Sequence, residues 1–339
     1  MKIAQLMAGA AQGGAELFFE RMSVGLRDAG EMVLPVIRPD PARVARLRKA
    51  GLEPVGLRFG GPLDVLTKPR AARALRGFGT EVAVAWMSRA AFHAPRGDWM
   101  LVGRLGGYYD LKYFRNCDRL VGNTRDIVRW ITAQGWPAER VAYLPNFVDD
   151  FADAVPASRA DLGVPDAVPL ALALGRLHRV KGFDVLIRAM VCVPHAHLVI
   201  AGEGPERGAL ERLVGAYGLR DRVHLVGWRT DIGSLLKTAQ VFVSSSRHEP
   251  LGNMVLEAFS AGVPVVATAA EGPSELMTDG MDGVLVAIDD HAALGRAIAE
   301  VLANGAAGLG AAGRARFEAE FAAPVVVAAW RDYLARVTR

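Results

Sequence analysis

Two glutamates, Glu249 and Glu257, lie eight residues apart in the stretch SSSRHEPLGNMVLEAFSAGVP (244–264). An ionised carboxylate in an apolar segment is costly unless a partner holds it. The pattern predicts a strand that ends at Ser246, a loop that carries Glu249, and a helix over 251–261. Both acids could then accept hydrogen bonds from a diol such as a ribose. The alternative is a solvated loop acid and a helix acid satisfied within the protein.

The start of that helix is a second candidate for ligand binding. Pro250 suits the run into a helix, and the backbone amides near Leu251, Gly252 and Asn253 would then form its positive end. Such an end binds a phosphate or the oxygens of a sugar without help from a side chain.

Two cations follow another apolar run. Arg176 and Lys181 lie five residues apart in GRLHRVKG (175–182). A guanidinium that clamps and an ammonium that acts as a point charge together suit a diphosphate, although basic residues on a loop are often only surface groups. In AGEGPERGAL (201–210), Gly202 and Gly204 predict a tight turn whose backbone a ligand could approach closely. A plain turn between strand and helix is the alternative.

Short apolar runs alternate with amphipathic helical patterns along the whole chain, which is typical of parallel sheets covered by helices. The predicted strands are 2–7, 31–37, 81–87, 100–105, 119–124 and 141–149, then 168–177, 195–202, 223–228, 240–246, 263–269 and 282–288. We expect two doubly wound, Rossmann-like α/β domains that face each other across a cleft, over 1–150 and 168–320. The segment 151–167, rich in Ala, Asp and Pro, is predicted to link them. Ligands of such sheets bind beyond the carboxyl ends of the strands.

Composition narrows the class of protein. The chain has 339 residues, of which 51% are hydrophobic and 22% charged, so it can bury two ordinary cores. Cys117 and Cys192 have no metal-ligand spacing and form no disulfide framework, which fits a reducing cytoplasm. His195 and His197 have no third ligand near them, so we expect no metal. No apolar run reaches the roughly 18 residues of a membrane-spanning helix.

The charge is unevenly distributed. Residues 1–150 hold 22 Lys and Arg against 15 Asp and Glu, a balance of +7, whereas the remainder holds 18 against 21, a balance of −3. The excess lies largely in ARVARLRK (42–49) and KPRAARALR (68–76). Solvated helix faces are one explanation, and a surface for anionic lipid at the inner membrane is another. Nucleic acid is not expected, because both stretches lack interleaved aromatic residues.

Taken in order, five motifs resemble the retaining glycosyltransferases of family four, which have the GT-B fold. They are GRLHRVKGFDVLIRA, AGEGPERGALERL, VHLVGWRTDI, SSSRHEPLGNMVLEAFSAGVPVVAT and DGMDGVLV, and the similarity covers 168–290. The resemblance implies that Arg176 and Lys181 hold the donor diphosphate, that Glu249 and the amides after Pro250 contact the transferred sugar, and that Glu257 binds the ribose. It also implies that Gly204 contacts the donor and that Trp228 and Arg229 occupy the loop near the base.

The resemblance extends to the first half. GGAE (13–16) matches the family's first glycine loop, which implies that the amides of Gly13 and Gly14 lie near the diphosphate and the acceptor. YLPNFVD (143–149), with Asn146, matches the segment between the domains, although Phe147 replaces a common glycine. In RLGGYYD (104–110), Gly106 and Gly107 stand where relatives often carry a histidine, and His93 is the alternative acceptor-side residue. The resemblance implies that 321–339 crosses back to the first domain.

These observations predict a cytoplasmic, metal-independent, retaining hexosyltransferase, peripheral at the inner membrane if its basic surface contacts lipid. Its donor would be a nucleotide-diphosphate-sugar, with UDP first and GDP next, and this donor is a substrate rather than a cofactor. The acceptor would be a cell-envelope glycan, such as lipopolysaccharide, or a lipid-linked sugar. The alternatives are a nucleotide-sugar epimerase of the same fold and a non-catalytic sugar-binding relative. A dinucleotide oxidoreductase is disfavoured, because AGAAQGGAE (8–16) is no clean G-x-G-x-x-G.

Overall fold

The computed structural model describes residues 1–10, 13–61, 63–304 and 307–338. The chain divides into two compact units, each with its own sheet. Unit 1 comprises Met1–Phe147 and Ala323–Arg339, and unit 2 comprises Val148–Ala322. The predicted fold class, two doubly wound α/β domains with parallel sheets, is confirmed.

Unit 1 is built on a seven-stranded sheet. The strands are β1 (Lys2–Met7), β2 (Met32–Ile37), β3 (Val55–Gly56), β4 (Val82–Trp86), β5 (Met100–Leu105), β6 (Arg119–Gly122) and β7 (Val141–Tyr143). All neighbours are parallel, in the order β3-β2-β1-β4-β5-β6-β7. The helices are α1 (Gly14–Asp28), α2 (Pro41–Lys49), α3 (Thr67–Phe78), α4 (Met87–His93), α5 (Arg125–Ala133) and α13 (Ala323–Thr338).

Alternation along the strands gives this sheet two buried faces. On β1, Ile3 and Met7 point into one apolar cluster, and Ala4 and Leu6 point into another. Helices α1, α2 and α13 cover the first face, and α3, α4 and α5 cover the second. Parallel strands buried on both faces read as continuous apolar runs, which explains why the sequence located them.

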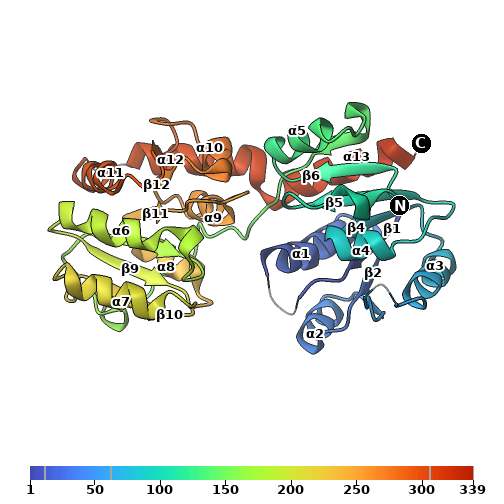
Figure 1. The fold of residues 1–339 in the computed structure, drawn as a ribbon, viewed down its shortest axis with the longest axis horizontal. Helices are drawn as coiled ribbons and strands as arrows, with labels where there is room; N and C mark the ends of the chain where they lie inside the picture. The colour runs from blue at the N-terminus through green and yellow to red at the C-terminus, as the bar shows by residue number, and fades with distance from the viewer. Residues whose placement is uncertain (11–12, 62, 305–306, 339) are drawn as a thin grey trace. The chain divides into compact units, whose positions relative to one another are not determined.

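The last helix, α13, belongs to unit 1, and the red end of the ribbon lies with the blue-to-green elements in Figure 1. Its buried residues include Val326, Trp330 and Leu334, spaced four apart on one helical face. Trp330 stacks on Trp86 of β4, with ring centroids 6.2 Å apart. Phe147 packs edge-on against Phe18, with ring centroids 5.2 Å apart.

One helix of unit 1 was missed by the sequence analysis. The strand predicted over 81–87 ends at Trp86, and α4 follows at once, with Met87 at a φ of 63°. This left-handed conformation is unusual for a residue other than glycine. The chain therefore passes directly from strand to helix, without the loop that would have marked the boundary in the sequence.

Unit 2 is built on a six-stranded sheet. The strands are β8 (Leu170–Leu174), β9 (His197–Ala201), β10 (Val223–Gly227), β11 (Val241–Ser244), β12 (Val265–Thr268) and β13 (Val284–Val286). They are parallel, in the order β10-β9-β8-β11-β12-β13. The helices are α6 (Phe183–Ala189), α7 (Arg207–Ala216), α8 (Ile232–Thr238), α9 (Asn253–Ser260), α10 (Glu271–Leu276), α11 (His291–Ala303) and α12 (Ala307–Arg316), the last continued by a π-helical turn at Phe317–Phe321.

The segment 151–167, predicted to be a linker, packs within unit 2. Leu162 and Val164 are buried in the core of the unit. The guanidinium of Arg159 donates hydrogen bonds to the carbonyl oxygens of Pro165 and Val168. The Ala, Asp and Pro content of this segment therefore reflects turns that lie on the domain rather than a free connection.

Each sheet has a point at which the strand order reverses. In unit 2, β8 and β11 are adjacent although helices and two strands separate them in sequence. In unit 1 the corresponding pair is β1 and β4. The loops after such a pair diverge to opposite faces, and the crevice between them is where open α/β sheets bind ligands. In unit 2, these are the loops that carry Arg176, Lys181 and Glu249.

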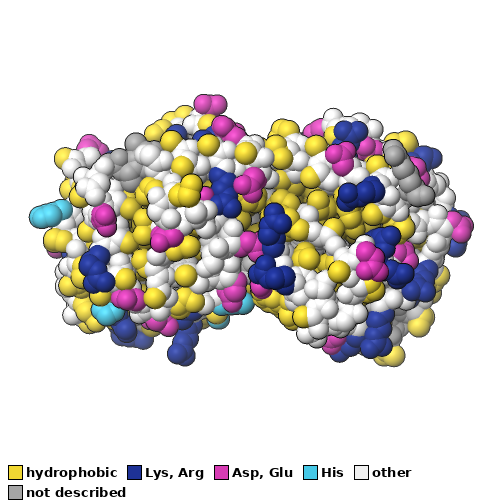
Figure 2. Space-filling view, turned by 90° about the horizontal axis from the view of Figure 1, so that it is seen from above, with side chains coloured by type: hydrophobic (Ala, Val, Ile, Leu, Met, Phe, Trp, Pro, Cys, Tyr) yellow, Lys and Arg dark blue, Asp and Glu magenta, His cyan; other side chains and the backbone are white. Residues whose placement is uncertain are grey.

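The two basic stretches, on α2 and α3, differ in how many of their cations form ion pairs with acids. On α2, Arg43 and Arg46 pair with Glu20, and Arg48 pairs with Glu53. On the face drawn in Figure 2, Lys and Arg side chains lie interspersed with Asp and Glu.

Among the residues that the structure describes, no helix is long and apolar enough to cross a membrane.

Candidate functional site

Three loops at the carboxyl end of the unit 2 sheet are joined by their backbones. The amide of Leu177 donates to the carbonyl of Glu203 at 2.9 Å, which links the loops after β8 and β9. The amide of Gly202 donates to the carbonyl of Gly227 at 2.8 Å, which links the loops after β9 and β10. These loops are therefore held as one layer above the sheet.

The glycines of this layer make room for neighbouring backbone. A Cβ on Gly204 would lie 2.4 Å from the carbonyl oxygen of Leu177, and one on Gly202 would lie 1.8 Å from that of Gly175. Gly182 has a φ of 61°, and its Cβ would lie 2.0 Å from the oxygen of Ser245. Close packing between the loops already requires both Gly202 and Gly204, which favours the plain turn over the approach of a ligand as the reason for these glycines.

The structure brings together two of the predicted catalytic residues. The ammonium of Lys181 forms an ion pair with the carboxylate of Glu249. The Lys181 side chain is 16% exposed and that of Glu249 is 14% exposed. Ser245, the residue after β11, holds the Lys181 backbone by donating its hydroxyl to the Lys181 carbonyl at 2.9 Å. Arg176 is exposed on the same loop as Lys181, and among the described residues its guanidinium has no ion pair.

The loop that carries Glu249 is held by α10, which the sequence analysis did not identify as part of the site. The Glu249 amide donates to one carboxylate oxygen of Glu271 at 3.1 Å, and the other oxygen lies 2.8 Å from Nδ1 of His248. The amide of Gly272 donates to the carbonyl of Glu249 at 2.7 Å. A Cβ on Gly272 would lie 2.3 Å from the carbonyl oxygen of Leu251. Glu271 and Gly272 follow strand β12, so the strand-end rule could have found them.

Arg247, two residues before Glu249, is held by two acids. Arg247 donates both terminal nitrogens to Asp184, each at 2.8 Å, and its Nε to Asp289 at 2.6 Å. The hydrogen bonds from Arg247 lower the pKa of Asp184, against the opposing effect of burial. The segment before Glu249 is thus anchored to α6 and to the loop after β13.

Helix α9 begins at Asn253, two residues later than predicted. Gly252 precedes it with a φ of 84°, a conformation that favours glycine. Pro250 and the buried Leu251 therefore lie in the loop. Glu257 is the fifth residue of α9, about 6 Å along its axis at about 1.5 Å per residue, and its side chain is half-buried.

The loop after β10 carries the residues that the resemblance assigns to the base. Trp228 is 66% exposed. The guanidinium of Arg229 forms a two-point ion pair with Asp231, with distances of 2.8 and 2.5 Å. That contact raises the pKa of Arg229 and lowers that of Asp231. Trp228 therefore offers an open ring face, whereas Arg229 is already engaged.

In the glycine loop of unit 1, Gly9 and Gly13 lie next to the carboxylate of Glu16. The carboxylate of Glu16 accepts from the amide of Ala10 at 2.8 Å. A Cβ on Gly9 or on Gly13 would lie 2.2 Å from a Glu16 oxygen. Gly14 begins α1 and is exposed. The glycines at 9 and 13 are thus required by Glu16, which the sequence analysis did not propose for the site.

Three predicted acceptor-side residues lie near a buried cation. Arg104 is 1% exposed, lies over the rings of Trp86 and Phe18, and donates to Oδ1 of Asn146 at 2.5 Å. Burial lowers the pKa of Arg104 to about 10. A Cβ on Gly106 would lie 2.3 Å from its Nη1. Gly107 follows in the same loop and is half-buried.

His93 lies elsewhere in unit 1 and is 3% exposed. Its Nε2 lies 3.0 Å from the carbonyl oxygen of Gly60, and its ring packs edge-on against Phe59 and Phe92. Little of the imidazole is available to an acceptor in this arrangement, and its contacts order the loop after β3.

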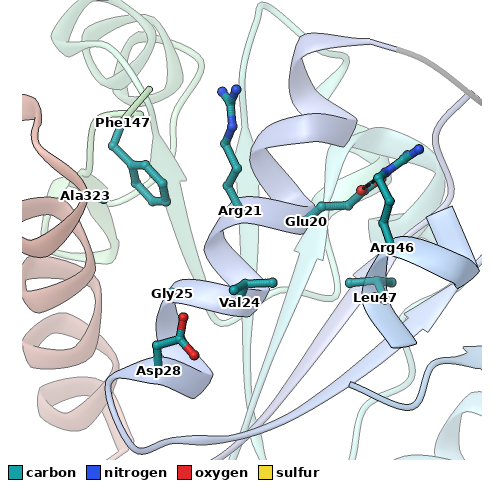
Figure 3. A pocket seen from close by; sticks show the side chains of 9 residues that line it. All are labelled: Glu20, Arg21, Val24, Gly25, Asp28, Arg46, Leu47, Phe147 and Ala323. Carbon is teal, nitrogen blue, oxygen red and sulfur yellow. Dashed lines mark hydrogen bonds and ion pairs between the residues drawn. The ribbon is translucent and has the colours of Figure 1, made fainter. Parts of the chain in front are cut away.

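A further pocket of about 360 Å³ lies beside α1 in unit 1. Its floor is apolar, and an ion pair between Arg46 and Glu20 closes one side (Figure 3). Residues lining it come from α1, α2 and the chain at Phe147 and Ala323.

Within the described ranges, no group of three His, Cys, Asp or Glu could hold a metal ion.

Two parallel-sheet α/β units, with these loops above the strand reversal of unit 2, define the GT-B fold. Solved structures agree. The chain matches a glycosyltransferase from Rickettsia africae with a TM-score of 0.87 at 16% identity, covering 100% of this chain and 98% of that one. It matches Anabaena HepE, crystallised with UDP, with a TM-score of 0.84 at 21% identity, covering 99% and 100%.

Sequence comparison identifies the family. Residues 155–316 match the family model for glycosyl transferases group 1. The lipopolysaccharide core biosynthesis glycosyltransferase LpsE of Rhizobium meliloti (strain 1021) is 35% identical over 302 residues, with 86% of each chain covered. LpsD of the same organism is 36% identical over 307 residues, covering 88% of this chain and 87% of its own. The chain therefore belongs to the glycosyl transferases group 1 family, and the resemblance seen in its motifs is confirmed at this level.

Proposed function

We propose that this glycosyltransferase moves a sugar from a nucleotide-diphosphate-sugar to a lipopolysaccharide-core or lipid-linked acceptor, with retention at the anomeric carbon. The observation that carries the proposal is the Lys181–Glu249 ion pair above the reversal between β8 and β11. It places a cation and an acid where a sheet of this kind binds its ligand.

In the proposed reaction, the acceptor hydroxyl oxygen attacks the anomeric carbon of the donor sugar. The bond between that carbon and the β-phosphate oxygen breaks, and the nucleoside diphosphate leaves. The acceptor proton passes to a phosphate oxygen of the leaving group on the same face. Arg176 and Lys181 would stabilise the negative charge that develops on the diphosphate, an effect commonly worth two to three orders of magnitude in rate, about 100-fold to 1000-fold.

Glu249 would accept hydrogen bonds from the hydroxyls of the transferred sugar, since its carboxylate lies beside Lys181. The backbone amides of Leu251, Gly252 and Asn253 would face the same sugar and the β-phosphate. Glu257, on α9, would bind the ribose, and the exposed ring of Trp228 would contact the base. Gly13 and Gly14 of unit 1 would approach the diphosphate. Arg104, Asn146, Gly106 and Gly107 would belong to the acceptor side.

Relatives differ in the nucleotide that they use. A structural neighbour, Anabaena HepE, was crystallised with UDP-glucose. A relative from Mycolicibacterium smegmatis, 34% identical over 239 residues, is GDP-mannose-dependent. We place UDP first and GDP second. The proposed acceptor is supported by LpsE and LpsD, whose names assign them to lipopolysaccharide core biosynthesis.

Contact with an anionic membrane surface would involve α3 rather than α2. The basic side chains of α3 are exposed, whereas those of α2 largely pair with acids. The loop before α3 exposes Leu63 by 93% and Val65 by 75%. Exposed apolar residues beside cations suit an interface with anionic lipid. Flotation with phosphatidylglycerol vesicles tests this, since Leu63→Ser with Val65→Ser should reduce binding, and equal binding by wild type and variant would refute it.

Incubation of the purified chain with UDP- and GDP-hexoses and truncated lipopolysaccharide tests the function. We expect nucleoside diphosphate release that depends on acceptor, an α-linked product from an α-donor by proton NMR, and no loss of rate with EDTA. Release of an epimerised free sugar without acceptor would instead identify an epimerase. Binding of the sugar with no turnover would identify a non-catalytic relative.

A further inference from the structure

A pocket in unit 1 lies at the amino-terminal ends of β6 and β7, at the opposite end of the sheet from the glycine loop. Its volume is about 400 Å³. Arg119 begins β6, Arg140 immediately precedes β7, and Arg336 lies in the last turn of α13. The lining residues are Arg119, Glu139, Arg140, Val141, Ala142, Tyr333, Arg336 and Val337.

The charges of this pocket are not balanced. Three arginines line it against one acid, Glu139. Within the part of the chain that the structure describes, none of these four side chains forms an ion pair. The pocket beside α1 differs, because its Arg46 donates two hydrogen bonds to Glu20 (Figure 3). Arg336 also complements the carbonyl end of α13, so Arg119 and Arg140 carry more of the argument.

A buried hydroxyl provides an independent observation. Tyr333 is 5% exposed, and its hydroxyl has no hydrogen-bond partner among the described residues. The guanidinium carbon of Arg336 lies 5.8 Å from the centre of its ring. Burial raises the pKa of Tyr333 to about 12, so the hydroxyl keeps its proton at neutral pH and can donate it. A buried donor without a partner is costly, and an acceptor oxygen in the pocket would satisfy it.

We propose that this pocket binds a phosphate group, with Arg119 and Arg140 as its charged ligands and the Tyr333 hydroxyl as a hydrogen-bond donor. Guanidinium groups match phosphate oxygens in geometry and charge, and a phenol adds a neutral donor. The phosphate belongs either to a soluble compound or to the headgroup of a lipid. None of the residues that line this pocket is among those proposed to hold the donor.

Calorimetric titration with inorganic phosphate tests the site in the Arg176→Gln background, which removes a cation from the donor loop. We expect one saturable site, weakened at least about tenfold by Arg119→Gln and several-fold by Tyr333→Phe. Arg140→Gln, at an exposed position, serves if Arg119→Gln impairs folding. Arg296→Gln on α11 removes an exposed charge of unit 2 and should leave phosphate binding unchanged.

Flotation distinguishes the two sources of phosphate. Vesicles of phosphatidylglycerol and phosphatidylethanolamine are compared with vesicles of phosphatidylcholine. Loss of phosphatidylglycerol binding in Arg119→Gln and Tyr333→Phe, but not in Arg296→Gln, supports a lipid headgroup. Loss of inorganic phosphate binding alone supports a soluble ligand. The proposal is overturned if neither variant differs from Arg296→Gln in either assay.

Discussion

Lys181 and Glu249 are 68 residues apart in sequence and form an ion pair between the loops that follow β8 and β11. These strands are neighbours at the point where the order of the unit 2 sheet reverses. Each of the two residues satisfies the charge of the other. A diphosphate beside Lys181 and sugar hydroxyls beside Glu249 would replace that contact, so the pair keeps both side chains ordered before the donor binds.

Removing either partner should abolish most of the transfer activity, but with different effects on nucleotide binding. Lys181→Ala should weaken binding of the nucleoside diphosphate and lower kcat/KM by about 100-fold or more, because a cation next to the leaving group is lost. Glu249→Gln should lower kcat similarly while the affinity for the free nucleoside diphosphate changes little, since Glu249 is proposed to contact the sugar rather than the nucleotide. Steady-state kinetics and calorimetry separate the two.

Arg179→Gln is the matched control for this pair, because Arg179 is an exposed cation on the same loop. Its kinetics should stay within about twofold of wild type. If Arg179→Gln loses as much activity as Lys181→Ala, the loop acts through its total charge and the specific role of Lys181 is wrong.

Gly204→Ala should destabilise unit 2 by about 1–3 kcal/mol, the usual cost of overpacking. The new Cβ would lie 2.4 Å from the Leu177 carbonyl oxygen, and backbone must shift to admit it. Gly208→Ala, within α7, has only the end of the Arg212 side chain near its Cβ and should stabilise by about 0.5–1 kcal/mol. Urea denaturation followed by circular dichroism measures both, and equal stability of the two variants would contradict the packing explanation.

Glu271→Gln should lower kcat about tenfold and leave nucleoside diphosphate binding unchanged, because Glu271 holds the Glu249 loop and is not among the residues proposed to contact the nucleotide. Its carboxylate holds both the Glu249 amide and the His248 ring. Glu275→Gln on the same helix is a control for the loss of an acid. A fall in nucleotide affinity equal to the fall in kcat would show that Glu271 acts on the whole site instead.

The stability of unit 2 should fall as the pH drops below about 6.5, the usual pKa of histidine. His197 and His224 are stacked, with Nδ1 of one 3.0 Å from Nε2 of the other. Burial lowers the pKa of both, and for His197 the charge of His224 adds to this effect. The unfolded chain therefore binds protons at these two histidines more tightly than the folded chain does. The free energy of unfolding keeps its full value above about pH 6.5 and falls as the pH drops through the folded pKa values.

Urea denaturation at pH 7.5 and 5.5 measures this loss in wild type and in the variant His197→Gln with His224→Gln. The double variant should lose less stability between the two pH values. An equal loss in both proteins would assign the pH dependence to other groups.

The sequence predicted the strands well because both sheets are parallel and buried on both faces, which leaves continuous apolar runs such as LALAL in β8. It also placed Arg176, Lys181 and Glu249 correctly on loops at strand ends. It did not predict Glu271, whose partner amide lies 22 residues earlier in the chain. Contacts of that kind depend on the order of strands in the sheet, which periodicity does not encode.

Glycine was the least informative residue type. Gly13 and Gly204 fit a phosphate-binding loop by sequence, yet the atoms next to their missing Cβ belong to Glu16 and Leu177. A glycine reports only that something lies close to the backbone. The buried Arg104 was missed for a related reason, because it sits within an apolar strand and its π contacts with Trp86 and Phe18 come from other elements.

Calorimetric titration of wild type, Lys181→Ala and Arg179→Gln with UDP and with GDP is the sharpest test of the proposed donor site. We expect one of these nucleotides to bind wild type and Arg179→Gln at one site per chain. Binding should be at least about tenfold weaker in Lys181→Ala, through loss of a charged contact to the diphosphate. Absence of binding by either nucleotide, or equal affinity in all three proteins, would contradict a donor site at the reversal between β8 and β11.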